Sequence, residues 1–204
     1  MFEHIQCEQN TPEWFKSRLG KWIASQFSKC LSPTGKISKS ASKVNDQLIL
    51  ERLTGERKLF FQSDAMKRGN ELEPEALSWI NDNSIYNFED VGFFCSGLGY
   101  GCSPDAVDWG HKLGIEVKCP NIETHLKYLK DAKIPTKYYS QVQGQLLVSG
   151  FDSWYFLSYF PNELPLMVRV ERDEPFIEQL KEELLKNIKL IEEGVDEVTI
   201  ALQG

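Results

Sequence analysis

Residues 101–120, GCSPDAVDWGHKLGIEVKCP, constrain the fold of this chain more than any other part of the sequence. The segment ends in an alternating run, Ile115-Glu116-Val117-Lys118, that follows a turn marked by glycines. Alternation with a period of two is typical of a β-strand, with the two aliphatic residues on one face and Glu116 and Lys118 on the other. The segment therefore predicts a strand that presents an acid and a lysine side by side.

A second acid lies upstream of this strand, in Ser103-Pro104-Asp105. If Asp105 ends a neighbouring antiparallel strand, its carboxylate lies about 5 Å across the ladder from Glu116. Two such carboxylates repel each other, and a hard cation such as Mg²⁺ offsets that repulsion. Lys118 beside the ion can orient a water or stabilise phosphate charge, as in metal-assisted phosphodiester hydrolysis. The same residue pattern also arises by chance on a solvated strand, so these residues alone leave both interpretations open.

Composition is that of a globular protein. The 204 residues, 41% hydrophobic and 12% aromatic, suffice for a single domain over residues 1–204 without disulfides. No apolar run approaches the roughly 20 residues that span a bilayer, and residues 1–11 lack a signal-peptide pattern. The five cysteines are scattered and include no CxxC pair, which predicts reduced thiols rather than disulfides or an iron–sulfur cluster. We expect a cytoplasmic protein with no membrane partner.

The net charge of −7 argues against a broad basic surface of the kind that many DNA-binding proteins carry. Part of this acidity belongs to the C-terminal segment, and carboxylates in a metal site are neutralised by the bound ion. DNA contact would then depend on the local charge inside a groove, so the whole-chain charge does not exclude a DNA substrate.

Periodicity, capping residues and glycine or proline breaks predict the secondary structure. The expected helices are 12–20, 25–31, 45–53, 63–83, 122–131, 135–150 and 173–194, the fourth with a kink or restart at Pro74. The expected strands are 91–95, 99–104, 113–119, 153–160 and 166–171. This order predicts an α/β (α+β) fold in which helices flank a mixed β-sheet.

Further candidates for the site lie on the predicted helices. Glu73, just before Pro74, is a possible third acid. Arg18 could hold an anion through its guanidinium, and Ser25 could do so through a hydroxyl at a helix N-terminus, although a surface charge and an ordinary cap explain both as well. One polar face of the helix at 135–150 combines Tyr138, Gln141 and Gln145.

With these pieces placed, the chain resembles the lambda exonuclease and YqaJ-type viral recombinase group of the PD-(D/E)XK nuclease superfamily. Four blocks carry the resemblance in order: TPEWFKSRLGKWIAS, then RGNELEPEA, then GCSPDAV with GIEVKCP, and finally IPTKYYSQVQGQLLVSG. The resemblance covers most of the chain, from about residue 11 to residue 171. The resemblance implies a restriction-endonuclease-like core.

The resemblance also implies roles for individual residues. The ligands of Mg²⁺ or Mn²⁺, two ions in all, would be Asp105, Glu116, the backbone carbonyl of Val117 and Glu73. Lys118 would activate or position the attacking water. Beside the scissile phosphate, the YxxQ element would be Tyr138 and Gln141. A pocket for the 5′-phosphate of a DNA end would consist of Arg18, Ser25 and Ser103. The loop residues that either contact substrate or fill a turn are Asp108, Trp109 and His111.

From this resemblance we expect a Mg²⁺-dependent exodeoxyribonuclease that digests linear double-stranded DNA from 5′ to 3′ and leaves 3′ single strands for recombination. The implied partners are double-stranded DNA ends, a single-strand annealing recombinase and further copies of the chain in a trimeric ring, in a bacterial or phage-infected cell. The alternatives are a structure-specific or nonspecific endonuclease of the same fold and a non-catalytic DNA-end binding scaffold. A restriction-like enzyme with base readout is a weaker alternative, because no helix is rich in Arg, Asn and Gln.

Overall fold

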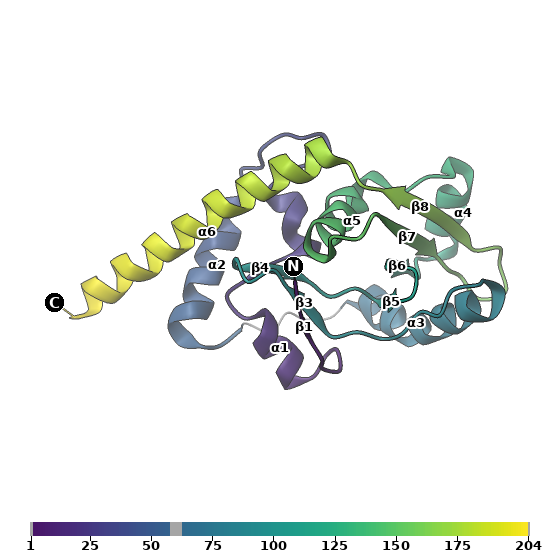
Figure 1. Ribbon diagram of the computed structural model, residues 1–204, viewed down its shortest axis with the longest axis horizontal. Helices are drawn as coiled ribbons and strands as arrows, with labels where there is room; N and C mark the ends of the chain where they lie inside the picture. The colour runs from purple at the N-terminus through teal and green to yellow at the C-terminus, as the bar shows by residue number, and fades with distance from the viewer. Residues whose placement is uncertain (1, 58–62, 204) are drawn as a thin grey trace.

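Two four-stranded mixed sheets with helices around them form the framework of the protein (Figure 1). The computed structural model describes residues 2–57 and 63–203. The expected mixed α+β class is confirmed, although the strands divide into two sheets instead of forming one. Within the described ranges, no helix has both the length and the apolar character needed to cross a bilayer.

The first sheet combines two strands near the N-terminus with two strands between residues 93 and 102. Its order is β1 (Glu3–Ile5), β3 (Phe93–Cys95), β4 (Tyr100–Cys102) and β2 (Trp22–Ile23). The two central strands are antiparallel, whereas β2 and β4 run parallel, with Trp22 opposite Tyr100 and Ile23 opposite Gly101. Strands β1 and β2 were not predicted, because segments of two or three residues are too short to show alternation.

The second sheet carries the strand on which the sequence prediction centred. Its order is β5 (Ala106–Asp108), β6 (Leu113–Lys118), β7 (Ser153–Ser158) and β8 (Leu166–Glu171). The predicted strands 99–104 and 113–119 are not partners, since the short strand β5 pairs with β6 instead. Pro104 lacks the backbone N–H that a continued ladder requires, so the chain leaves the first sheet there and enters the second.

In the part of the chain that the structure describes, seven helical segments surround the sheets. They are α1 (Pro12–Arg18), η1 (Ala24–Lys29), α2 (Ala41–Thr54), α3 (Asp64–Asn83), α4 (Ile122–Asp131), α5 (Thr136–Ser149) and α6 (Glu174–Gln203). The segment expected as a helix at 25–31 is the 3₁₀ helix η1. Helix α3 continues through Pro74 without a restart, and α6 extends past its expected end at Gly194, projecting away from both sheets (Figure 1).

Helix α5 lies at the centre of the main core. Its buried Val142 and Leu146 join residues of η1, α6 and both sheets in one hydrophobic cluster. The helix comes close to η1 because it has no side chain at Gly144, where a Cβ atom would lie 2.1 Å from Cδ2 of Phe27. On the other face of β6, Ile115 and Val117 belong to a second cluster with α3, so the alternating pattern of β6 is confirmed.

We expect Gly144→Ala to lower the free energy of unfolding by about 1–3 kcal/mol, because the added methyl overlaps the Phe27 ring in a packed core. Denaturant unfolding would measure the change. Gly69→Ala is the control, since Gly69 also lies within a helix but a Cβ atom there meets no atom within 4 Å. That substitution should leave stability unchanged or raise it by up to about 1 kcal/mol. Equal effects of the two substitutions would contradict this account of α5 packing.

Candidate active site

The hairpin of β5 and β6 brings the two acids of the central motif together. Its register places Ala106 opposite Ile115, and continued by one residue it sets Asp105 opposite Glu116. Oδ2 of Asp105 accepts a hydrogen bond from the backbone N–H of Val117 at 2.6 Å. This bond fixes the Asp105 side chain against the strand that carries Glu116.

Glu116 is the most deeply buried acid of the site, with 1% of its surface exposed. It points toward α5, where two glutamines four residues apart donate to its two oxygen atoms. Nε2 of Gln141 lies 2.6 Å from Oε1, and Nε2 of Gln145 lies 2.6 Å from Oε2. A buried carboxylate is costly unless it is paired and hydrogen-bonded, and α5 provides these donors.

Lys118 supplies the positive charge at this end of β6. Its Nζ forms an ion pair with Oε1 of Glu116 and donates to the carbonyl of Val117 at 2.9 Å. It also lies 5.6 Å from the centre of the Tyr138 ring, which stacks on Phe156. Burial lowers the pKa of Lys118, but Glu116 and Asp105 more than offset this and raise it overall, so the side chain remains a cation.

Glu73 reaches the same region from α3 and adds a third negative charge. Burial, together with Glu116 and Asp90, raises its pKa to about 7, although Lys118 opposes this shift. The pKa of Asp105 is also raised, by burial and by Glu116. Three carboxylates thus interact with one ammonium group, and the pKa values of Glu73 and Asp105 are raised chiefly by burial and in addition by the neighbouring negative charge.

The donor set fits a hard divalent cation. The carboxylate of Glu116 and the backbone carbonyl of Val117 already contact the same cation, the ammonium group of Lys118. Oxygen ligands of this kind suit Mg²⁺ or Mn²⁺. In residues 2–57 and 63–203, no three Asp, Glu, His or Cys side chains are gathered closely enough to hold a metal by themselves. An ion here would therefore need the backbone carbonyl in addition to Asp105 and Glu116.

The residues predicted to bind a 5′-phosphate lie near the first sheet. The guanidinium of Arg18 stacks over the Trp14 ring at 3.6 Å, and Nε1 of Trp14 donates to Oγ of Ser103 at 2.8 Å. Ser25 follows β2 and Ser103 follows β4. Because these strands run parallel, both serines lie at the same end of the strand pair. Ser25 is exposed, and among the described residues no hydrogen bond joins it to Arg18 or Ser103.

Arg18 is unusual because its charge is poorly compensated. Burial, together with the nearby Arg57, lowers its pKa to about 9, although Glu51 opposes this shift. Its buried Nε has no hydrogen-bond partner among residues that the structure describes. A buried guanidinium with an unused donor is suited to an anionic ligand.

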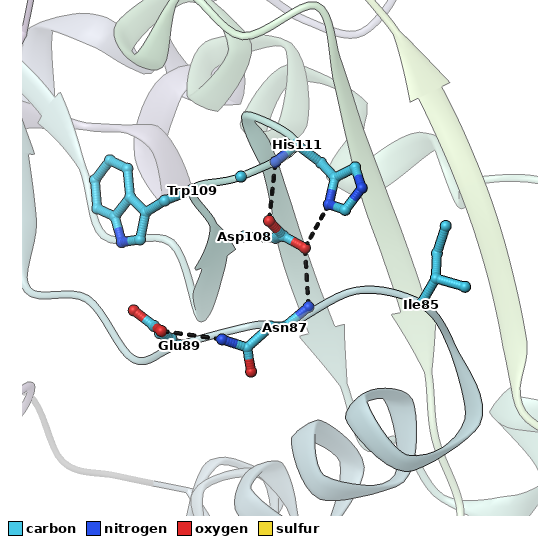
Figure 2. Close-up of a pocket in the computed structure, with 7 residues that line it drawn as sticks. Ile85, Asn87, Glu89, Asp108, Trp109 and His111 are labelled. Carbon is cyan, nitrogen blue, oxygen red and sulfur yellow. Dashed lines mark hydrogen bonds and ion pairs between the residues drawn. The ribbon is translucent and has the colours of Figure 1, made fainter.

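The structure separates the loop of β5 and β6 from this site. Figure 2 shows a surface pocket of about 270 Å³ at the turn, lined by Asp108, Trp109 and His111 among others. The Asp108 carboxylate accepts from the backbone N–H groups of Asn87 and His111 and pairs with Nδ1 of His111 at 2.8 Å. Asp108 therefore closes the turn, at the opposite end of β6 from Lys118.

Two residues of the site went unassigned at the sequence level. Trp14 connects Arg18 with Ser103, but a tryptophan in a helix gives no sign of its polar contact. Gln145 was placed on the same helical face as Gln141 but received no role. Its spacing of four residues from Gln141 was the available signal, because such residues project from the same side of a helix.

The raised pKa of Glu73 predicts a pH dependence of stability in the metal-free protein. Between its ordinary value of 4.5 and about 7, the folded protein retains a proton that the unfolded chain releases. The free energy of unfolding should therefore decrease as pH rises through this window, and Glu73→Gln should reduce that slope. Urea unfolding across this pH range measures it. The exposed Glu71 on the same helix gives the control Glu71→Gln; a wild-type slope in Glu73→Gln would contradict the prediction.

Two crystal structures similar to this chain are structures of the exonuclease LHK-Exo. The chain is 30% identical to LHK-Exo in a crystal structure with dAMP, with a TM-score of 0.84 and coverage of 95% of this chain and 98% of that one. A second crystal structure, of the alkaline exonuclease LHK-Exo from Laribacter hongkongensis, gives 29% identity and a TM-score of 0.85 at the same coverage.

A more distant likeness concerns the fold alone. A phage related exonuclease from Haemophilus somnus 129PT is 18% identical, with a TM-score of 0.66 and coverage of 87% of this chain and 96% of that one. Comparison with curated protein sequences gives no match. The family model for the YqaJ-like viral recombinase domain matches residues 13–152, which include the central hairpin and all of the other predicted site residues. The chain therefore belongs to the family of YqaJ-like viral recombinase domains.

Proposed function

We propose that this chain is a metal-dependent exodeoxyribonuclease of the lambda exonuclease type, which digests linear double-stranded DNA from 5′ to 3′ and leaves a 3′ single strand. The observation that carries the proposal is the juxtaposition of Asp105 and Glu116 on the β5–β6 hairpin, with the ammonium of Lys118 paired to Glu116. The 30% identity to an exonuclease over nearly the full chain supports the same reaction class.

The proposed metal ligands are Asp105, Glu116 and the carbonyl of Val117. Glu73, which interacts electrostatically with Glu116 and Lys118, would assist a second ion. Mg²⁺ or Mn²⁺, when bound, supplies Lewis-acid stabilisation of phosphate charge and lowers the pKa of a water. The hydrogen bond from Val117 to Asp105 holds the peptide of Val117 in place, and α5 orients the Glu116 carboxylate.

Lys118 acts as a hydrogen-bond donor beside the scissile phosphate. Its raised pKa keeps it protonated, so it can hold the attacking water or stabilise the negative charge that builds up on the phosphate. Tyr138 flanks the ammonium with its ring, which limits where Lys118 can move. Gln141 donates to the oxygen of Glu116 that also contacts Lys118, and so it fixes the acid and the lysine relative to each other.

Arg18, Ser25 and Ser103 form the proposed pocket for the 5′-phosphate. The unused donor of Arg18 and the hydroxyl groups at the edge of the first sheet supply the positive charge and hydrogen bonds for a phosphate group. Membership of a viral recombinase family supports a role in DNA recombination. The proposal extends to a single-strand annealing protein as partner and to a trimeric ring around DNA, which the resemblance to lambda exonuclease implies.

Digestion assays distinguish the proposed reaction from its alternatives. With Mg²⁺, the protein should degrade a linear duplex carrying 5′-phosphates and leave a closed circular plasmid intact, and EDTA should stop the reaction. Lys118→Ala should reduce the rate by about a hundredfold or more, because it removes the cation of the site. The exposed Lys127 provides the control Lys127→Ala, which should retain activity. Cutting of the circle would instead indicate an endonuclease, and no metal-dependent loss of either DNA would indicate a binding scaffold.

Arg18→Ala should slow digestion of 5′-phosphorylated ends by about tenfold or more, because charge-assisted hydrogen bonds to the phosphate are lost. Digestion of 5′-hydroxyl ends should change much less. Initial rates on paired substrates that differ only in the terminal phosphate provide the measurement. Lys16→Ala, at an exposed position of the same helix, should affect neither substrate. Equal wild-type rates on the two substrates would rule out the pocket.

A further inference from the structure

Gln145 makes a contact with the active site that no other described residue duplicates. Its Nε2 donates to Oε2 of Glu116 at 2.6 Å. The other oxygen, Oε1, is contacted by both Gln141 and Lys118, whereas Gln145 is the one donor to Oε2 in the described part of the chain. The side chain is fully buried.

A structural role by itself explains this glutamine poorly. Its Oε1 is buried and has no hydrogen-bond partner among the described residues. Burying an unsatisfied amide oxygen destabilises a fold, and an apolar side chain of the same length would fill the space without that cost. What the amide provides is its donor to Glu116.

The helix that carries Gln145 is held firmly at other points. Oγ of Ser140 donates to the carbonyl of Leu31, and Gln143 bonds the backbone of Glu171 and Asp173. The absence of a side chain at Gly144 brings the helix against Phe27. Because these contacts fix α5, the amide groups four residues apart meet the Glu116 carboxylate at fixed positions.

We propose that Gln145 is a positioning residue for the metal site: together with Gln141 it fixes the plane of the Glu116 carboxylate, the group that would ligate a divalent cation. This inference rests on the proposed metal-dependent function and extends it to a residue outside the predicted site. Residues that orient a ligating carboxylate typically change metal affinity 10–100-fold when replaced.

Calorimetric titration of the metal-free protein with Mn²⁺ alone tests the proposal. Gln145→Met keeps the length of the side chain and removes the donor, so Mn²⁺ binding should weaken about tenfold or more. Gln143→Met is the matched control, because Gln143 is an equally buried glutamine of the same helix whose amide bonds only backbone atoms of Glu171 and Asp173. Among variants that unfold cooperatively, only Gln145→Met should lose affinity.

Kinetics provide a second measurement on the same proteins. In Gln145→Met, the Mn²⁺ concentration needed for half-maximal digestion of a linear duplex should rise, while KM for the DNA at saturating Mn²⁺ stays at the wild-type value. If Gln145→Met does not fold, Gln145→Asn, which keeps the amide but is one methylene too short to reach Glu116, should show the same loss.

The outcomes separate this inference from the function on which it rests. Wild-type Mn²⁺ affinity in a folded Gln145 variant would overturn the positioning role and leave the proposed nuclease intact. No Mn²⁺ binding by the wild-type protein would overturn the metal-dependent function itself, and the positioning role with it.

Discussion

The burial of the Glu116 carboxylate between β6 and α5 is the constraint on which the rest of the site depends. A charged group that is 1% exposed requires donors on every side, and these come from Gln141, Gln145 and Lys118. To deliver them, α5 must pack closely on the core, which the glycine at 144 permits. The electrostatics of the site and the packing of the central helix are therefore parts of one arrangement.

Much of the fold and of the site was predictable from local sequence patterns. The period of two in β6 placed Ile115 and Val117 on one face and Glu116 on the other. The structure agrees, with the two aliphatic residues packed in the cluster that includes α3. Helix starts with side-chain caps were also predictable: Thr11, Ser63 and Asn121 each accept a hydrogen bond from the first turn of their helix. Information of this kind lies within a few residues of the chain and needs no tertiary context.

Features that depend on distant partners were not predictable. Strand β2 has two residues and exists because Trp22 and Ile23 pair with β4, some 80 residues away in the chain. The division into two sheets depends on how the chain turns at Pro104, and the sequence could not show that β5 would replace β4 as the partner of β6. The contact between Trp14 and Ser103, and that between Gln145 and Glu116, likewise join residues that only the folded chain brings together.

The segment in which the chain passes from the first sheet to the second also fixes the spacing between the two proposed sites. Ser103 belongs to the proposed phosphate pocket and Asp105 to the proposed metal site, and only Pro104 separates them. The ring of Pro104 restricts its backbone, and its carbonyl accepts a hydrogen bond from Gln9 at 2.7 Å. Two residues extend over at most about 7 Å, so the backbone positions of Ser103 and Asp105 are held within that distance of each other. A residue inserted beside Pro104 would therefore shift the proposed phosphate pocket relative to the proposed metal site.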